Sequence, residues 1–196
     1  VVRGGVGARP ATRDVLRAIE RSHTPEVVVL PNDKDVRAVA EAAADQARPT
    51  GIRVAVIPTR ATVQVLAALA VHDPARRFDD DVVGMTAAAR ATRHGEVTLA
   101  TREALTSAGV CQPGDVLGLL EGDVALIGAD VVEVAKGLLD RLLAAGGELA
   151  TLVMGAEAGD HLAPLIVEHL RRTHPEVETE VFEGGQTFYP VLIGVE

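Results

Sequence analysis

The sequence predicts an α/β protein of two lobes, each built around a βαβ-type unit, with mixed sheets and an antiparallel hairpin in the second lobe. Short runs rich in Val, Leu and Ile are typical of buried strands, and apolar residues at helical spacing lie between them. Apolar residues make up 47% of the 196 positions and aromatic residues only 2%. Such a composition suits a sheet covered by Ala-rich helices. We expect the lobes to be residues 1–92 and 93–196.

The first lobe alternates helices with apolar runs. Helices are expected at 12–22, 36–47, 62–70 and 81–91, and strands at 26–30 and 52–57. Thr12 is expected to cap the first helix. Both strands are followed directly by proline, and the helix 36–47 connects them, which indicates a parallel βαβ unit.

The second lobe changes pattern. Strands are expected at 96–101, 116–120, 124–127, 149–154, 176–182 and 191–195, and helices at 131–142 and 161–172. The strand 96–101 alternates polar and apolar residues, as a half-exposed antiparallel strand does. Glu121-Gly122-Asp123 is typical of a tight hairpin turn, and Asp130 is expected to cap the next helix. Leu165 is expected on the inner face of the last helix.

Charge and composition exclude several functions. The net charge of −9, from 19 basic and 28 acidic residues, argues against a non-specific binder of nucleic acid or anionic membrane. No run approaches the roughly 20 apolar residues that a membrane helix needs. The one cysteine, Cys111, allows no internal disulfide, which favours a reducing, cytoplasmic location. The chain begins at Val1 without a Met, so we expect a fragment of a longer protein.

Few residues suggest catalysis. No HExxH or CxxC spacing occurs, so we expect no metal site and assign no catalytic residue. Gly4, Gly5 and Gly7 precede a helix and form a candidate anion loop, although a tight turn without a ligand is the alternative. The loop lacks the Lys and Ser/Thr of a P-loop. Gly184-Gly185 repeats its pattern, because a proline follows five residues later in both places.

Asn32 and Lys34 are the strongest candidates for binding in the first lobe. They follow the carboxyl end of a predicted strand and precede a helix, the place where ligands and partners bind in open α/β sheets. Lysine is rare in this chain, while arginine is common. The alternative is an Asx-type turn that only caps the helix.

A series of short motifs runs through the chain in order. They are Gly4-Gly5, Pro10 to Leu16, Val28 to Lys34, Val56 to Thr59, Gly95 to Thr98, Thr101-Arg102, Pro113 to Asp115, Gly118 with Gly122, and Glu183 to Thr187. Together they resemble the C-terminal region of dihydroxyacetone-kinase-like proteins, the large subunits of bacterial fatty acid kinases. The family often has Gln-Thr after the first Gly-Gly, where this chain has Val6-Gly7, and often has Asn at the position of Asp33. The second loop keeps Gln186.

The resemblance implies that catalysis belongs to a different domain of the protein. An N-terminal domain of the family binds ATP and aspartate-held magnesium, and it phosphorylates the carboxylate of a fatty acid presented by a DegV-like protein. The acyl phosphate feeds phospholipid synthesis. We therefore expect no cofactor and no kinase activity in this fragment alone.

Our main hypothesis is a non-catalytic region that docks the DegV-like carrier. The expected contact residues are Asn32, Lys34, Arg102, Gly184, Gly185 and Gln186. Lys34 and Arg102 would be charge partners, Gln186 an amide hydrogen-bonder, and the glycines sites of close backbone approach. One alternative is a stand-alone, glycerone-kinase-like phosphotransferase that binds phosphate or a small molecule. The other is a dimerisation scaffold that pairs the strand 96–101 or the hairpin at Gly122 across a two-fold axis.

Overall fold

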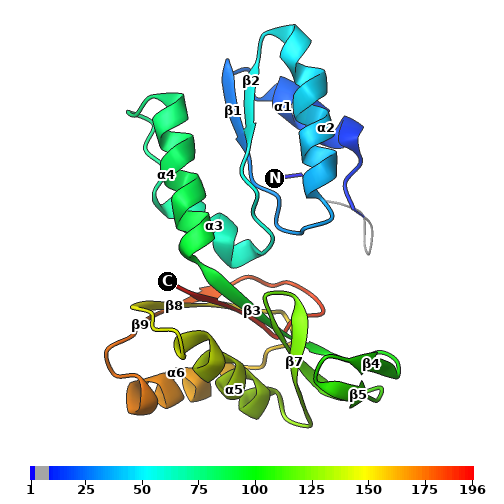
Figure 1. Cartoon of the computed structure of the whole chain (residues 1–196), viewed down its shortest axis with the longest axis vertical. Coiled ribbons are helices and arrows are strands. Elements are labelled where there is room, and N and C mark those ends of the chain that lie inside the picture. The colour runs from blue at the N-terminus through cyan, green and yellow to red at the C-terminus, as the bar shows by residue number, and fades with distance from the viewer. Residues whose placement is uncertain (3–8) are drawn as a thin grey trace. The chain divides into compact units, whose positions relative to one another are not determined.

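The computed structural model describes residues 1–2 and 9–196, and the chain divides into two compact units, Val1–Ala91 and Thr92–Glu196. The α/β class is confirmed (Figure 1). The candidate anion loop of Gly4, Gly5 and Gly7 lies outside the described residues. Within the described part of the chain, no helix is both long and apolar enough to cross a membrane.

Unit 1 has three layers around a two-stranded parallel sheet of β1 (Glu26–Val29) and β2 (Arg53–Val56). Its helices are α1 (Thr12–Arg21), α2 (Arg37–Ala47), the short 3-10 helix η1 (Arg48–Thr50), α3 (Thr62–Ala70) and α4 (Phe78–Ala91). Alternate strand residues face opposite sides: Val27 and Val29 pack with α1 and α2, while Val28 packs with α3 and α4. The predicted parallel βαβ unit is thus confirmed.

Two helix starts in unit 1 differ from expectation. The residue before α1 is Ala11, not Thr12, and its N–H donates to the Asp14 carboxylate over 3.4 Å. The carboxylate of the first turn thus accepts the N–H of the residue before the helix, whereas a capping threonine hydroxyl would have accepted an N–H inside the first turn. Helix α4 begins at Phe78, three residues early, and keeps Asp81 in its first turn. A negative charge is favourable there because the helix dipole is positive at its N-terminus.

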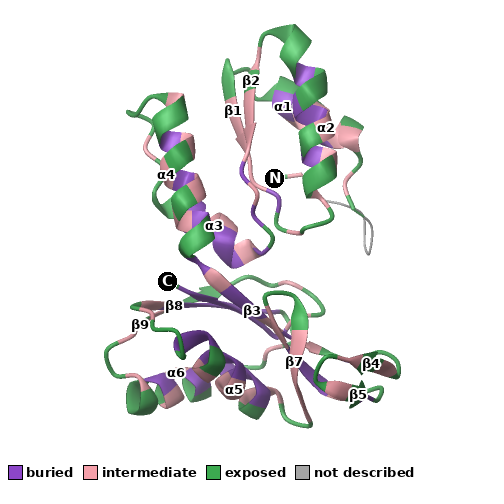
Figure 2. Cartoon of the chain, in the orientation of Figure 1, coloured by how far each residue is buried: buried purple, intermediate pink, exposed green. Residues whose placement is uncertain are grey.

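Unit 2 is a six-stranded mixed sheet with helices on one face (Figure 1). The strands are β3 (Arg93–Leu99), β6 (Val116–Leu120), β7 (Asp123–Gly128), β8 (Leu149–Met154), β9 (Glu178–Glu183) and β10 (Val191–Val195). Their order is β7-β6-β3-β10-β8-β9, and only the β8–β9 pair is parallel. Two helices, α5 (Val131–Leu143) and α6 (Leu162–Thr173), cover this sheet. Each buries the apolar side chains of one face against β3, β8 and β10 (Figure 2).

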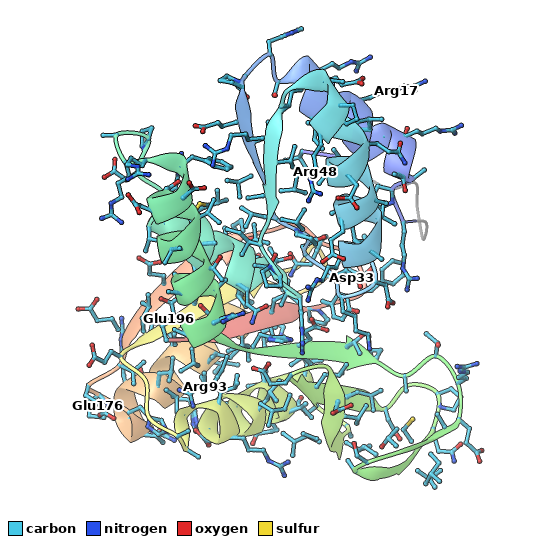
Figure 3. All side chains as sticks on the ribbon, turned by 45° about the horizontal axis from the view of Figure 1, so that its top comes forward. Arg17, Asp33, Arg48, Arg93, Glu176 and Glu196 are labelled. Atoms are coloured by element: carbon cyan, nitrogen blue, oxygen red, sulfur yellow. The ribbon has the colours of Figure 1, made fainter. Side chains whose placement is uncertain are left out.

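Specific residues fix α5 on the sheet. Asp130 caps it as predicted, because its carboxylate accepts the Glu133 N–H at 2.9 Å. The absence of a side chain at Gly95 lets the helix approach closely, since a Cβ there would lie 2.9 Å from Leu138 Cδ2. At the other end of the helix, the guanidinium of Arg93, labelled in Figure 3, donates to the carbonyl of Leu142 in the last turn and to that of Gly146 beyond it. Such bonds satisfy carbonyls that a helix C-terminus leaves unpaired.

Some expectations for unit 2 are wrong. The strand expected at 96–101 spans 93–99 and is antiparallel, but it lies inside the sheet, hydrogen-bonded to β6 on one side and β10 on the other. It therefore has no free edge with which to pair across a two-fold axis. Leu165 is 43% exposed rather than on the inner face of α6. Glu121 and Gly122 have φ of 53° and 92°, which confirms the tight hairpin turn.

A second hairpin was not foreseen. Strands β4 (Ala104–Thr106) and β5 (Gly109–Cys111) pair antiparallel in a region for which the sequence predicted no strand. Cys111 is buried and packs with Leu117, whereas Leu105 and Val110 form a cross-strand pair that is 84% and 56% exposed. The Ser107 hydroxyl at the tip donates to the Val124 carbonyl at 2.6 Å. The hairpin is thereby attached to the rest of unit 2.

Candidate functional site

The strand register gathers several loops at one end of the six-stranded sheet. Leu99, the last residue of β3, pairs with Val116, and Val191 pairs with Met154, the last residue of β8. Met154 in turn pairs with Glu183 at the end of β9. The loops 100–103, 112–115, 129–130, 155–161 and 184–190 therefore share this end, which we call the loop end. Arg102 and the residues Gly184 to Gln186 are thus brought to the same end of unit 2.

The 184–190 loop is held by backbone hydrogen bonds. The N–H groups of Gly184 and Gly185 both donate to the Met154 carbonyl, at 2.9 and 3.1 Å. The Gly155 N–H donates to the Pro190 carbonyl at 2.9 Å, and a Cβ on Gly155 would overlap the carbonyl oxygen of Tyr189. This close approach of two loops requires a glycine at position 155.

Gln186 has a structural task in this loop. Its side-chain amide nitrogen donates to the carbonyl of Val153 at 2.9 Å and to that of Tyr189 at 3.2 Å. The side chain is half-buried, and its amide nitrogen is engaged within the chain. We therefore assign Gln186 to positioning the loop rather than to donating a hydrogen bond to a partner.

Phe188 is the residue at the loop end that sequence reasoning missed. Its φ is 72°, in the left-handed region, and 67% of its surface is exposed. The Thr98 hydroxyl of β3 donates to the Phe188 carbonyl at 2.7 Å. The signal in the sequence was an aromatic residue directly after Gly-Gly-Gln-Thr, in a chain with only three phenylalanines.

The loop end combines exposed apolar and acidic side chains. Leu99 is exposed there, and Arg102 leads into the hairpin that carries Leu105 and Val110. Arg102 is the one Lys or Arg in the sequence of these loops. The carboxylates on these loops or at their edges are Glu103, Asp115, Asp130, Glu157, Asp160 and Glu183.

Asn32 and Lys34 belong to unit 1. Both are exposed in the turn after β1, beside Asp33 (Figure 3). The Asp33 carboxylate accepts the Asp35 N–H at 2.7 Å, which confirms an Asx-type turn here. The Thr59 hydroxyl donates to the Pro31 carbonyl, so the loop after β2 lies beside this turn. The Asp33 side chain is thus used to form the turn, whereas the side chains of Asn32 and Lys34 are exposed to solvent.

Unit 1 also holds a cavity of about 360 Å³ between its first strand and its last two helices. Asp81 lines it and is buried. The Asp73 N–H bonds the Asp81 carboxylate at 2.9 Å and His72 Nδ1 lies 2.7 Å from it, which together hold the pKa of this carboxyl group below its usual value against the effect of burial. In the described residues, no three His, Cys, Asp or Glu side chains are grouped as a metal site.

Comparison with known proteins identifies the family. The sequence pattern of the C-terminal region of FakA-like fatty acid kinases matches residues 1–196. This chain belongs to that family. An uncharacterized protein of Staphylococcus haemolyticus is 31% identical over 196 residues, and one from Staphylococcus aureus strain USA300 is 26% identical over the same length. The chain spans 35% of the length of each.

Solved structures share the fold at low sequence identity. The fatty acid kinase B3 protein of Streptococcus pneumoniae, loaded with linoleic acid, has a TM-score of 0.72 at 17% identity; the match covers 96% of this chain and 77% of that one. A fatty-acid-binding DegV family protein from Thermus thermophilus has a TM-score of 0.63 at 18% identity, covering 96% and 78%. The dihydroxyacetone kinase of C. freundii has a TM-score of 0.66 at 16% identity, covering 96% and 42%. These matches confirm the fold.

Proposed function

We propose that this chain docks a DegV-like, fatty-acid-loaded carrier for a fatty acid kinase. The family assignment makes the chain a kinase-associated C-terminal region. The observation that carries docking is the loop end, where Arg102, the Gly184–Gln186 loop and exposed apolar side chains meet. Exposed apolar patches with polar surroundings are typical of protein–protein contact sites.

The partner follows from the family and from the likeness in fold. The structure of fatty acid kinase B3 of Streptococcus pneumoniae contains linoleic acid, so that protein can hold a fatty acid, the substrate proposed for the kinase. Docking such a carrier would place the acyl carboxylate near a kinase domain outside the 196 residues. A protein that delivers the fatty acid also removes the need for this chain, with its charge of −9, to approach an anionic bilayer.

Catalysis, by this proposal, lies elsewhere in the protein. ATP and Mg²⁺ would bind the kinase domain, and the product would be an acyl phosphate that phospholipid synthesis consumes. This chain alone would transfer no phosphoryl group. Its contribution would be affinity and orientation, which raise the rate by holding two reactants in place.

Titration calorimetry tests the proposal. The chain is titrated with a fatty-acid-loaded DegV-like protein from the same genome, and separately with Mg-ATP. We expect heat of binding with the carrier and none with Mg-ATP. Binding of Mg-ATP without binding of the carrier would contradict the proposal and favour the stand-alone phosphotransferase, with Gly4, Gly5 and Lys34 as its phosphate site.

Matched variants test whether the β4–β5 hairpin contributes to carrier binding. Leu105→Ser with Val110→Ser removes the exposed apolar pair of the hairpin, and we expect weaker carrier binding because both side chains are exposed to solvent in the free chain. Val83→Ser on α4 is the control, since Val83 is also exposed but is not among the expected contact residues. Equal affinity for both variants would exclude the hairpin from the contact.

A further inference from the structure

Phe188 combines two unfavourable features. A φ of 72° is costly for any residue with a Cβ, and a 67% exposed aromatic ring leaves apolar surface in water. Residues that keep such a backbone conformation are held by their surroundings and cluster at functional sites. A glycine at this position would remove both costs.

The surrounding loop holds Phe188 in one position. The Thr98 hydroxyl bonds its carbonyl at 2.7 Å, and the Gln186 amide bonds the carbonyl of the next residue, Tyr189, at 3.2 Å. The Gly155 N–H bonds the Pro190 carbonyl at 2.9 Å. These bonds fix the backbone that carries the ring, so the loop loses little conformational freedom when a partner covers it, and such preorganisation favours affinity.

The charges near the loop end indicate what kind of surface would cover the ring. Its loops and their edges carry six carboxylates, from Glu103 to Glu183, and a single arginine, Arg102. A partner surface rich in Lys and Arg would be attracted, whereas an acidic surface or an anionic lipid headgroup would be repelled. Exposed aromatic side chains are common anchors at the centre of protein interfaces.

We propose that Phe188 is the anchor residue of the carrier interface and inserts into an apolar pocket rimmed by basic side chains on the DegV-like protein. This inference rests on the proposed docking function. Gln186 is a positioning residue that acts through Phe188. The contact would exclude water from the ring and pair the surrounding carboxylates with the basic rim.

The test compares stability and affinity in the full-length protein that the gene encodes. Phe188→Gly relieves the left-handed backbone and removes the ring. We expect an unchanged or higher melting temperature together with a Kd for the loaded carrier at least about tenfold higher, as for an interface anchor. A residue with only a structural role would lower the melting temperature and leave the Kd unchanged. Val83→Ala serves as the exposed control.

A double-mutant cycle tests the role of Gln186. Gln186→Ala is expected to weaken carrier binding in the wild-type background and to have no further effect in the Phe188→Gly background. Additive losses would overturn the positioning role. The Phe188→Gly arm does not depend on how well the Gln186 variant folds. Raised salt should weaken wild-type binding, because it screens the acidic loops from the basic rim.

The outcomes separate the two proposals. If the wild-type protein does not bind the carrier, the docking function fails and this inference fails with it. If the wild-type protein binds and Phe188→Gly binds equally well, docking stands and the anchor is overturned. Loss of affinity in Phe188→Gly without loss of stability supports both.

Discussion

The side-chain amide nitrogen of Gln186 lies 2.9 Å from the carbonyl oxygen of Val153, so a side chain as well as the backbone bonds of Gly184 and Gly185 fastens the loop after β9 to β8. The same nitrogen also bonds the Tyr189 carbonyl. One amide therefore fixes the path of the chain on either side of Phe188. This arrangement explains how a glycine-rich loop at the end of a sheet can hold a defined shape.

Gly155→Ala tests how closely the two loops approach. The new Cβ would overlap the Tyr189 carbonyl oxygen, so we expect a loss of about 1–3 kcal/mol of stability, as in other overpacked sites. Thermal unfolding measures it. Gly84→Ala in α4 is the matched control, because its Cβ would meet only Arg76 Nη1 at 3.5 Å. That substitution should add up to about 1 kcal/mol through helix propensity; stabilisation by both variants would contradict the described packing.

The buried carboxylate of Asp81 predicts an acid-sensitive step. Its pKa is lowered, chiefly by the hydrogen bond from the Asp73 N–H, so its ionised form stabilises the fold above the unfolded pKa of about 3.9. This stability is lost as the pH falls through the lower folded value. Asp81→Asn should cost about 1–3 kcal/mol at pH 7, and the difference from wild type should shrink below pH ~4. Denaturant unfolding at several pH values measures both, and a difference that does not change with pH would contradict the assignment.

Asp130 gives a clean test of helix capping. Its carboxylate accepts the Glu133 N–H at the start of α5, so Asp130→Ala should lower stability by about 1 kcal/mol. Asp130→Asn keeps an acceptor at the cap and should cost much less. Chemical denaturation of the two variants measures the difference. Equal losses would show that the cap bond contributes nothing.

Arg102 and Lys34 are predicted to be charge partners of the carrier. Both side chains are exposed, so Arg102→Ala and Lys34→Ala should leave the melting temperature unchanged. Each is expected to pair with a carboxylate of the carrier that lies apart from the basic rim around the Phe188 pocket. Each substitution should therefore weaken carrier binding, because charges at the edge of an interface act mainly through long-range attraction. Arg171→Ala, on the last turn of α6, is the control. The prediction fails if the control weakens binding as much as the two test variants do.

The sequence predicted elements whose local signals agree with their packing. The strands 116–120, 149–154 and 191–195 and the helix 62–70 have the predicted bounds, because long apolar runs with clear ends specify them. The cap at Asp130 was also readable, since a side-chain oxygen and a nearby N–H are local features.

Features that depend on residues far away in the sequence could not be predicted. The alternation in 96–101 indicated a half-exposed strand, but whether a strand lies inside a sheet or at its edge depends on strands far away in the sequence. The β4–β5 hairpin is short, and Cys111 is buried in a cluster with Ala100 and Leu117, which lie on either side of the hairpin in the sequence. The sequence indicated Gln186 as a candidate but did not indicate Phe188. The hydrogen bonds of this loop depend on carbonyls and a hydroxyl that the sheet brings close, so they could not be predicted.

Hydrogen exchange of the chain with and without the fatty-acid-loaded carrier tests the docking surface most directly. The account predicts that carrier binding slows exchange at the loop end, in peptides that cover residues 99–111, 155–161 and 184–190, and in the turn at 32–35. The outer faces of α5 and α6 should exchange at the same rate in both states. Protection confined to those helices, with none in 184–190, would contradict the proposal that this end of the sheet meets the carrier.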